Sequence, residues 1–149
     1  MEIITDESIL PEDLSADETL EDETEGYRES VAFDGTDFVR DGANRLVTSD
    51  GVSAYEDWCR ICLATEKGSL FCYPEDFGLD TSRIPNATSR GEVESILRKE
   101  ITDALMADSY QRTDSIESIE FDWIDSDSVE VEISVRGVDD TTVELEVTI

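Results

Sequence analysis

From residue 119 onward, the chain alternates apolar and polar side chains in three consecutive runs. Strict alternation over several residues is typical of a β-strand with one face buried and the other face in water. Residues 137–140 contain a glycine and two aspartates, so they predict a short turn between the last two runs. The runs therefore predict a three-stranded antiparallel meander, whose apolar face must be covered by other parts of the chain. The apolar members are Ile119, Phe121 and Trp123, then Val129, Val131, Ile133 and Val135, and finally Val143, Leu145, Val147 and Ile149.

Two earlier segments have the apolar spacing of amphipathic helices and could supply that cover. The first spans roughly residues 52–66, and the second spans roughly residues 90–107. Ser89 and Glu92 match a capping box at the start of the second helix. The apolar positions are Val52, Tyr55, Cys59, Cys62 and Leu63 in the first helix, and Val93, Ile96, Leu97, Ile101, Ala104 and Leu105 in the second.

The remaining apolar runs are short. Residues 31–33, 38–39 and 46–48 predict strands in a hairpin-like lead-in, and residues 70–73 predict a short buried strand that Pro74 ends. Residues 75–88 are expected to form a loop. The order β–β–α–β–α–β–β–β over residues 31–149 predicts a two-layer α+β domain, with two helices packed on a sheet that ends in the three-stranded antiparallel meander.

The charge of the chain excludes several classes of function. It has 39 acidic and 11 basic residues and a net charge of −28, which disfavours contact with nucleic acid or with an anionic membrane surface. The first residues lack the basic segment of a signal peptide. Residues 1–30 are strongly acidic and hold Arg28 as their single base, so we expect a flexible or partner-ordered arm. The acidic excess with few lysines also predicts a halophilic protein that works in concentrated salt.

No residue pattern indicates a catalytic or metal site. Cys59 and Cys62 lie in the middle of a predicted helix at apolar positions, so we expect core residues rather than a redox pair. Cys72 adds a third thiol, but the chain has no histidine and no fourth ligand at a familiar spacing. Nothing places a carboxyl pair in contrasting environments. We therefore expect no catalytic residue, no cofactor and no metal.

The segment after the first helix carries a motif with a definite order: Thr65, Gly68, Tyr73, Pro74, Phe77 and Gly78. It resembles the baseplate wedge proteins of contractile tails, a family often labelled lysozyme-like, and its pattern is closest to the branch found in Bacillus defective-prophage tails. Residues from Phe33, before the first helix, to Phe121, in the first run of the meander, fit the same order, so the resemblance covers about residues 31–149. We expect Tyr73 and Phe77 to pack on the helices, and Gly78 to have a positive φ because a side chain would be strained there.

The resemblance implies a structural baseplate subunit of a phage-type tail or a cellular injection device, located in the tail baseplate and assembled in the host cytoplasm. Its expected partners are larger wedge proteins, the tail sheath protein, and tube or hub proteins, with no direct nucleic acid and no membrane. On this interpretation the sheet templates the first sheath ring by strand addition, as an open strand edge can. The alternatives are an acidic DNA-mimic inhibitor and a peptidoglycan-cleaving glycosidase. The sequence offers no catalytic pair for the latter.

Two groups of residues are candidates for partner contact. Tyr110 and Arg112 stand where many members of the family carry Glu-Pro-Arg, so this loop could contact a partner, although Arg112 could instead be a cation at the end of the second helix. Val143, Leu145 and Val147 belong to the terminal strand, whose edge could accept a strand of another chain.

Overall fold

The computed structural model describes residues 29–149 and confirms the predicted meander. Strands β3 (Thr113–Trp123), β4 (Val129–Gly137) and β5 (Thr142–Thr148) form an antiparallel sheet in the order β3-β4-β5. The apolar side chains of all three strands point to one face, where those of β4 are buried. Most polar side chains of the same strands point to the opposite face; Thr113 at the start of β3 is an exception, because it is buried and its hydroxyl bonds to that of Tyr55 of α2.

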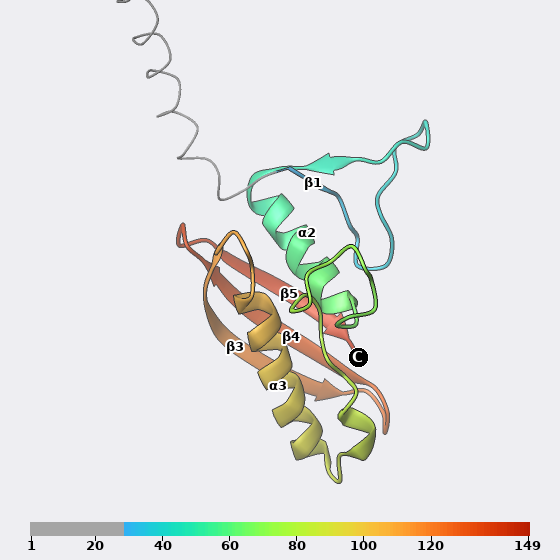
Figure 1. Ribbon diagram of the computed structural model, residues 1–149, viewed down its shortest axis with the longest axis vertical. Coiled ribbons are helices and arrows are strands. Elements are labelled where there is room, and N and C mark those ends of the chain that lie inside the picture. The colour runs from blue at the N-terminus through green and yellow to red at the C-terminus, as the bar shows by residue number, and fades with distance from the viewer. Residues whose placement is uncertain (1–28) are drawn as a thin grey trace, which may run out of the picture.

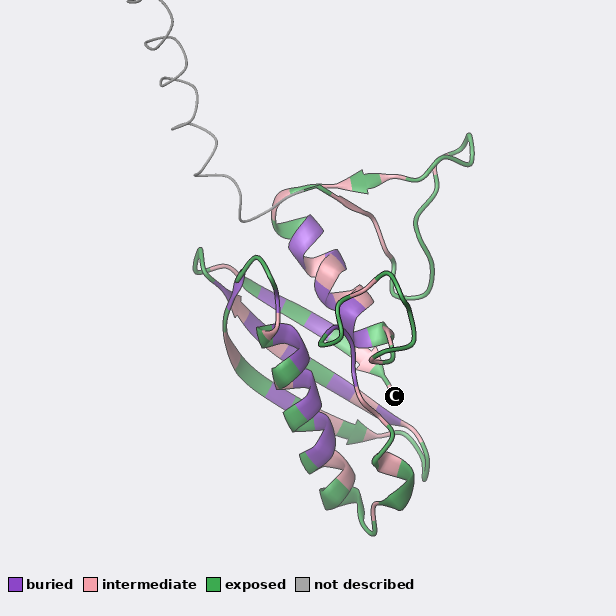
Figure 2. Ribbon diagram, viewed as in Figure 1, coloured by how far each residue is buried: buried purple, intermediate pink, exposed green. Residues whose placement is uncertain are grey.

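Helices α2 (Gly51–Ala64) and α3 (Arg90–Met106) lie on the apolar face of this sheet (Figure 1). Helix α2 contacts β5, and α3 contacts β3 and α2. Figure 2 shows the buried residues along the helix sides that meet the sheet. The predicted two-layer α+β class is therefore confirmed. Val52 departs from the predicted stripe because it lies in the first turn of α2 and is exposed.

Helix α3 begins with part of the predicted capping box. The Glu92 N–H donates to Ser89 Oγ at 3.2 Å, as the motif requires. The Glu92 carboxylate does not return to Ser89; it accepts from Thr88 N–H at 2.7 Å and from Thr88 Oγ1 at 2.9 Å. These hydrogen bonds lower the pKa of Glu92 and extend the cap by one residue.

The lead-in over residues 30–49 lies beside α2 (Figure 1). Strands β1 (Ser30–Val31) and β2 (Thr48–Ser49) pair with each other and not with the large sheet. Asp57 of α2 connects the helix to both ends of the lead-in, because it accepts from Phe33 N–H at 3.3 Å and from Ser49 Oγ at 2.5 Å.

The predicted acidic arm over residues 1–30 lies outside the described residues except for its last two positions.

The predicted strand at residues 70–73 is wrong. The chain forms turns there, Leu70 is exposed, and Phe71 is fully exposed. The physical reason is that Lys67 N–H donates to Leu79 O and Leu79 N–H donates to Thr65 O, both at 2.9 Å, so the segment between them is the tip of a closed loop without a neighbouring strand. The predicted loop over residues 75–88 holds one short 3₁₀ turn, η2 (Ile84–Asn86).

Candidate docking site

Strand β5 is an edge strand, and its hydrogen-bonding register shows which of its main-chain groups are used. Val129 and Ile149 exchange two hydrogen bonds, N–H to O at 2.9 Å in each direction. Such exchanging pairs recur at every second residue of an antiparallel ladder. By the observed register, the main-chain N–H and C=O groups of Val143, Leu145 and Val147 are hydrogen-bonded to β4. The intervening residues therefore direct theirs to the open side of the sheet: Thr142, Glu144, Glu146 and Thr148.

The open side of β5 is not covered by hydrogen bonds from elsewhere in the described chain. Within residues 29–149, no main-chain or side-chain group bonds to the N–H or C=O of Glu144, Glu146 or Thr148. Unpaired main-chain groups along a strand form a template for another strand. β5 therefore presents a free edge over most of its length.

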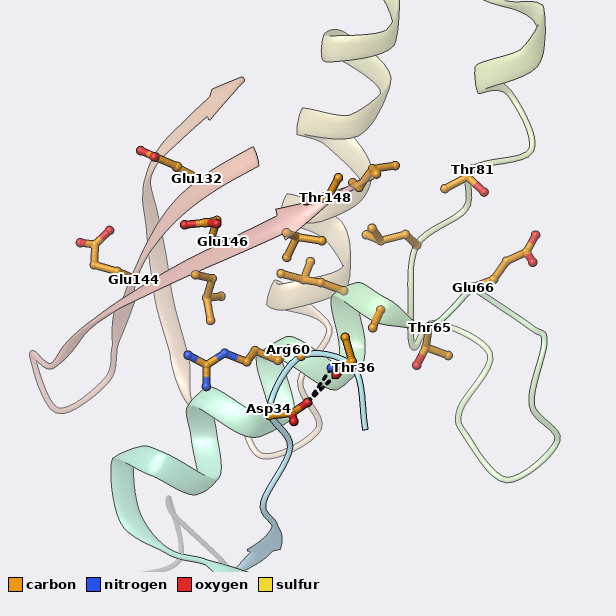
Figure 3. A pocket seen from close by; sticks show the side chains of 17 residues that line it. Asp34, Thr36, Arg60, Thr65, Glu66, Thr81, Glu132, Glu144, Glu146 and Thr148 are labelled. Atoms are coloured by element: carbon orange, nitrogen blue, oxygen red, sulfur yellow. Dashed lines mark hydrogen bonds between the residues drawn. The ribbon is translucent and has the colours of Figure 1, made fainter. Parts of the chain in front are cut away.

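This edge opens on a groove of about 1110 Å³ (Figure 3). The wall opposite β5 consists of the end of α2, the turn at residues 34–36, and the paired segments at residues 64–66 and 79–81. Leu63, Ala64 and Leu79 give the inner part of the groove an apolar lining. Arg60 reaches it from α2, where its guanidinium binds the carboxylate of Glu56.

The outer face of the sheet beside this edge is strongly acidic. Glu120, Glu132 and Glu146 lie directly opposite one another across the three strands. In the adjacent row, Glu130 stands opposite Thr148 and near Glu146; a hydrogen bond with Glu146 and the charge of that carboxylate raise the pKa of Glu130. Like charges in directly opposed positions destabilise a sheet, so this arrangement has an energetic cost in the isolated chain.

The other edge of the sheet differs. β3 has register shifts between Thr113 and Ser115 and between Ile116 and Ser118, and such bulges discourage further pairing. Arg98 of α3 donates from Nη1 to Ile119 O at 3.1 Å, which occupies an outward main-chain acceptor. The Arg98 guanidinium also lies 5.1 Å from the centre of the Phe121 ring. The two edges are therefore not equivalent, and β5 is the more accessible one.

The predicted residues of the terminal strand lie at this site, but their side chains are not the ones exposed. Val143 and Leu145 are buried and Val147 is half-buried, all on the helix side. The groups available to a partner belong to Glu144, Glu146 and Thr148, which the sequence analysis did not name as site residues. Alternation in the sequence distinguishes the apolar residues of β5 from the polar ones. It does not show which of them have free main-chain groups, because that depends on how β5 pairs with β4.

The other predicted contact residues, Tyr110 and Arg112, do not line the β5 groove. Arg112 is buried, and its Nε and Nη2 donate to the Asp108 carboxylate at 2.7 and 3.1 Å. Its guanidinium lies 4.9 to 5.5 Å from the ring centres of Tyr55, Trp58 and Tyr110. Asp108 thus neutralises the Arg112 charge. Tyr110 is half-exposed next to it.

The motif at residues 65–78 packs as a structural unit. Phe77 is buried and stacks on Tyr73 with ring centres 4.2 Å apart, and its ring edge meets Trp58 of α2 at 6.0 Å. Gly68 and Gly78 both have positive φ, at +76° and +97°. The positive φ predicted for Gly78 is confirmed. Thr65 Oγ1 donates to Ile61 O at 2.7 Å and so closes the last turn of α2.

The cysteines in the described residues are free thiols with different surroundings. Cys59 and Cys62 lie in the core, where burial raises the pKa of Cys59 to about 12 and that of Cys62 to about 11. Cys72 is exposed. Residues 29–149 contain no group of three or more possible ligands arranged to hold a metal ion. In the same residues, no helix has the length and apolar character required to cross a membrane.

The sequence also matches a known protein family. Residues 29–140 match a family described as contractile injection system sheath initiators, which defines the class of protein as a structural component of a contractile tail. Because the match covers more than half of the sequence, the chain belongs to the sheath initiator family. Family membership implies a location at the tail baseplate and a role in starting the sheath. No curated protein shows a significant match to the chain.

Proposed function

We propose that this protein templates the first sheath ring by accepting a strand of the sheath protein at the open edge of β5. The observation that carries the proposal is the row of unpaired main-chain groups at Glu144, Glu146 and Thr148, which faces a groove rather than the body of the domain. Strand addition supplies affinity through main-chain hydrogen bonds, and the groove adds pockets for alternate side chains. Residues 144–148 would accommodate a segment of about five residues, or roughly 17 Å.

The same proposal assigns docking on larger wedge proteins to the connection between α3 and β3. Tyr110 is half-exposed there, and Val138 of the β4–β5 turn is exposed and donates its N–H to Arg112 O at 2.9 Å. The Asp108–Arg112 pair holds this surface in place from beneath. Exposed aromatic and aliphatic side chains on a rigid support are suitable anchors for a protein interface. Tube or hub proteins are further candidates for this surface.

The motif order supports a wedge subunit of the branch found in Bacillus defective-prophage tails. This resemblance is the basis for the proposed assembly in the host cytoplasm before the tail is complete.

The decisive test is a proline at position 146. The Glu146 amide points away from β4, so Glu146→Pro removes a donor from the open edge without removing a hydrogen bond of the ladder. Glu146→Ala is the matched control, because it removes the carboxylate and keeps the amide. We expect baseplates with Glu146→Pro to fail in sheath polymerisation, measured by electron microscopy, while baseplates with Glu146→Ala start sheaths.

Both variants must first show a cooperative thermal transition, so that a folding defect is recognised. Sheath growth of normal frequency on Glu146→Pro baseplates would contradict the strand-addition mechanism. A map of the assembled baseplate gives a second readout, since the proposal requires main-chain pairing between β5 and a strand of another chain.

A further inference from the structure

We infer that the strand received at the β5 edge alternates apolar residues with Lys or Arg, with the basic side chains on the outer face of the sheet. This inference rests on the proposed strand addition and specifies the chemistry of the partner segment. It follows from two different surfaces that meet at the same edge.

The inner surface requires apolar side chains. A fourth strand beside β5 would direct every second side chain toward the helix layer, as β5 itself does with Leu145 and Val147. On that side the groove is lined by Leu63 and Ala64 of α2 and by Leu79. Polar residues, among them Thr65 and Arg60, also line the groove, and the Arg60 guanidinium is already paired with Glu56. Aliphatic side chains of the partner would extend the core there, whereas a charge would lose its hydration.

The outer surface requires positive charge. The opposed row Glu120–Glu132–Glu146 ends at the open edge, and Figure 3 shows Glu132, Glu144 and Glu146 on the side of the strands away from α2. A residue added opposite Glu146 would have its Cβ about 5 Å from the Cβ of Glu146. An acidic residue would lengthen a row of like charges, whereas Lys or Arg would pair with it. Glu144 creates the same preference two residues away along the strand.

The charge pattern also identifies the partner as a different chain. Residues 1–28 have Arg28 as their single base, so this segment cannot offer alternating basic residues. A second copy would bring its own β5, whose outward side chains include Glu144 and Glu146 and would double the repulsion. The acidic row therefore opposes pairing between copies while it leaves the edge available to a basic strand.

The test uses the purified full chain and synthetic peptides of seven residues. One peptide alternates Val and Lys, a second alternates Val and Glu, and a third has the composition of the first with its Val and Lys residues in separate blocks. We expect the alternating Val–Lys peptide to bind at least about tenfold more tightly than either of the others, measured by fluorescence anisotropy. The block peptide controls for non-specific attraction to an acidic protein.

Two substitutions in the same row provide the matched comparison. Glu146→Lys places a positive charge at the open edge and should transfer the preference to the Val–Glu peptide. Glu120→Lys relieves the same repulsion of Glu132 from the far strand, so it should leave the preference unchanged. Equal binding of the Val–Lys and Val–Glu peptides, or an unchanged preference in Glu146→Lys, would overturn the inference.

The Glu146→Pro variant separates this inference from the proposed function. If both alternating peptides bind equally and both are lost in Glu146→Pro, strand addition stands and the charge preference is wrong. If no peptide binds the unmodified chain, or if the Val–Lys peptide binds Glu146→Pro unchanged, strand addition at β5 is itself contradicted.

Discussion

The carbonyl oxygen of Thr65 lies 2.5 Å from the position that a Cβ on Gly78 would occupy. The same oxygen accepts the hydrogen bond from Leu79 N–H, so it cannot move aside without breaking the closure of the loop. Gly78 combines this close approach with a φ of +97°. The loop end is therefore closed by a backbone contact that only glycine permits.

We predict that Gly78→Val lowers the free energy of unfolding by about 3 kcal/mol or more, measured by urea denaturation. Gly68→Ala is the control, because Gly68 has a φ of +76° but no atom within 4 Å of an added Cβ. That variant should lose only about 1–2 kcal/mol. Equal losses would indicate that the close approach to Thr65 is not the cause. We expect tail assembly to fail only through lost stability, and normal stability with failed assembly would make this loop an interface.

The buried pair of Asp108 and Arg112 gives a second prediction. Asp108→Ala leaves a buried guanidinium without its counter-ion, so we expect a loss of about 3–5 kcal/mol in the free energy of unfolding. The exposed pair of Arg45 and Asp41, with an N···O distance of 2.9 Å, is the control. Arg45→Ala should cost less than about 1 kcal/mol. Similar small losses in both variants would show that Arg112 does not depend on Asp108.

The buried and exposed thiols should differ in their reactivity toward a thiol reagent, and the buried ones should make stability depend on alkaline pH. At pH 8, a thiol reagent should modify Cys72 in the native chain and reach Cys59 and Cys62 only after unfolding, as measured by mass spectrometry. Burial raises the pKa of Cys59 from 9.0 to about 12, so the unfolded chain loses this proton first as the pH rises. The associated stability is complete below pH 9 and is lost progressively toward pH 12.

Thermal melts between pH 8 and pH 11 measure this alkaline loss. Cys72→Ser is the control for the labelling, and it should remove the modification of the native chain. Rapid native labelling of Cys59 or Cys62 would contradict the packed core around α2.

Salt should stabilise the fold. The net charge is −28, and the Glu120–Glu132–Glu146 row adds repulsion within the sheet. Raising KCl from about 0.1 M to 2 M shortens the Debye length from about 10 Å to under 3 Å, which screens exposed charges. We expect a higher melting temperature by calorimetry in 2 M KCl. Equal melting temperatures would count against adaptation to concentrated salt and would leave the baseplate role unaffected.

The purified chain should not cleave peptidoglycan. Glu130, whose pKa is raised by Glu146, lies with that residue on the outer face of the sheet rather than in an apolar pocket such as a catalytic acid occupies. A turbidity assay on purified cell walls should give the rate of the buffer blank. Turnover that a single Asp or Glu substitution abolishes would instead favour the glycosidase alternative.

The sequence by itself determined the meander and the helices that cover it. A period of two in residues 119–149 and a helical period in α2 and α3 each assign one apolar face, and burial of those faces allows little other than a two-layer arrangement. The positive φ at Gly78 could also be predicted. The prediction of a strand at residues 70–73 was wrong, because an apolar run forms a strand only where a neighbouring strand can pair with it. The hydrogen bond between Thr65 and Leu79 closes a loop instead, and Phe71 at its tip is exposed to water.

Only the tertiary structure decided which edge of the sheet is open and which residues surround and neutralise the Arg112 guanidinium. Residues 119–123 of β3 alternate as β5 does, but Arg98 bonds to the outer edge of β3 and two bulges distort it, whereas the outer edge of β5 faces a groove that the end of α2 also lines. The burial of Arg112 depends on rings of α2 that are distant in sequence. Local patterns fix which side of an element is apolar, whereas accessibility and electrostatic pairing depend on contacts between elements that a local pattern does not encode.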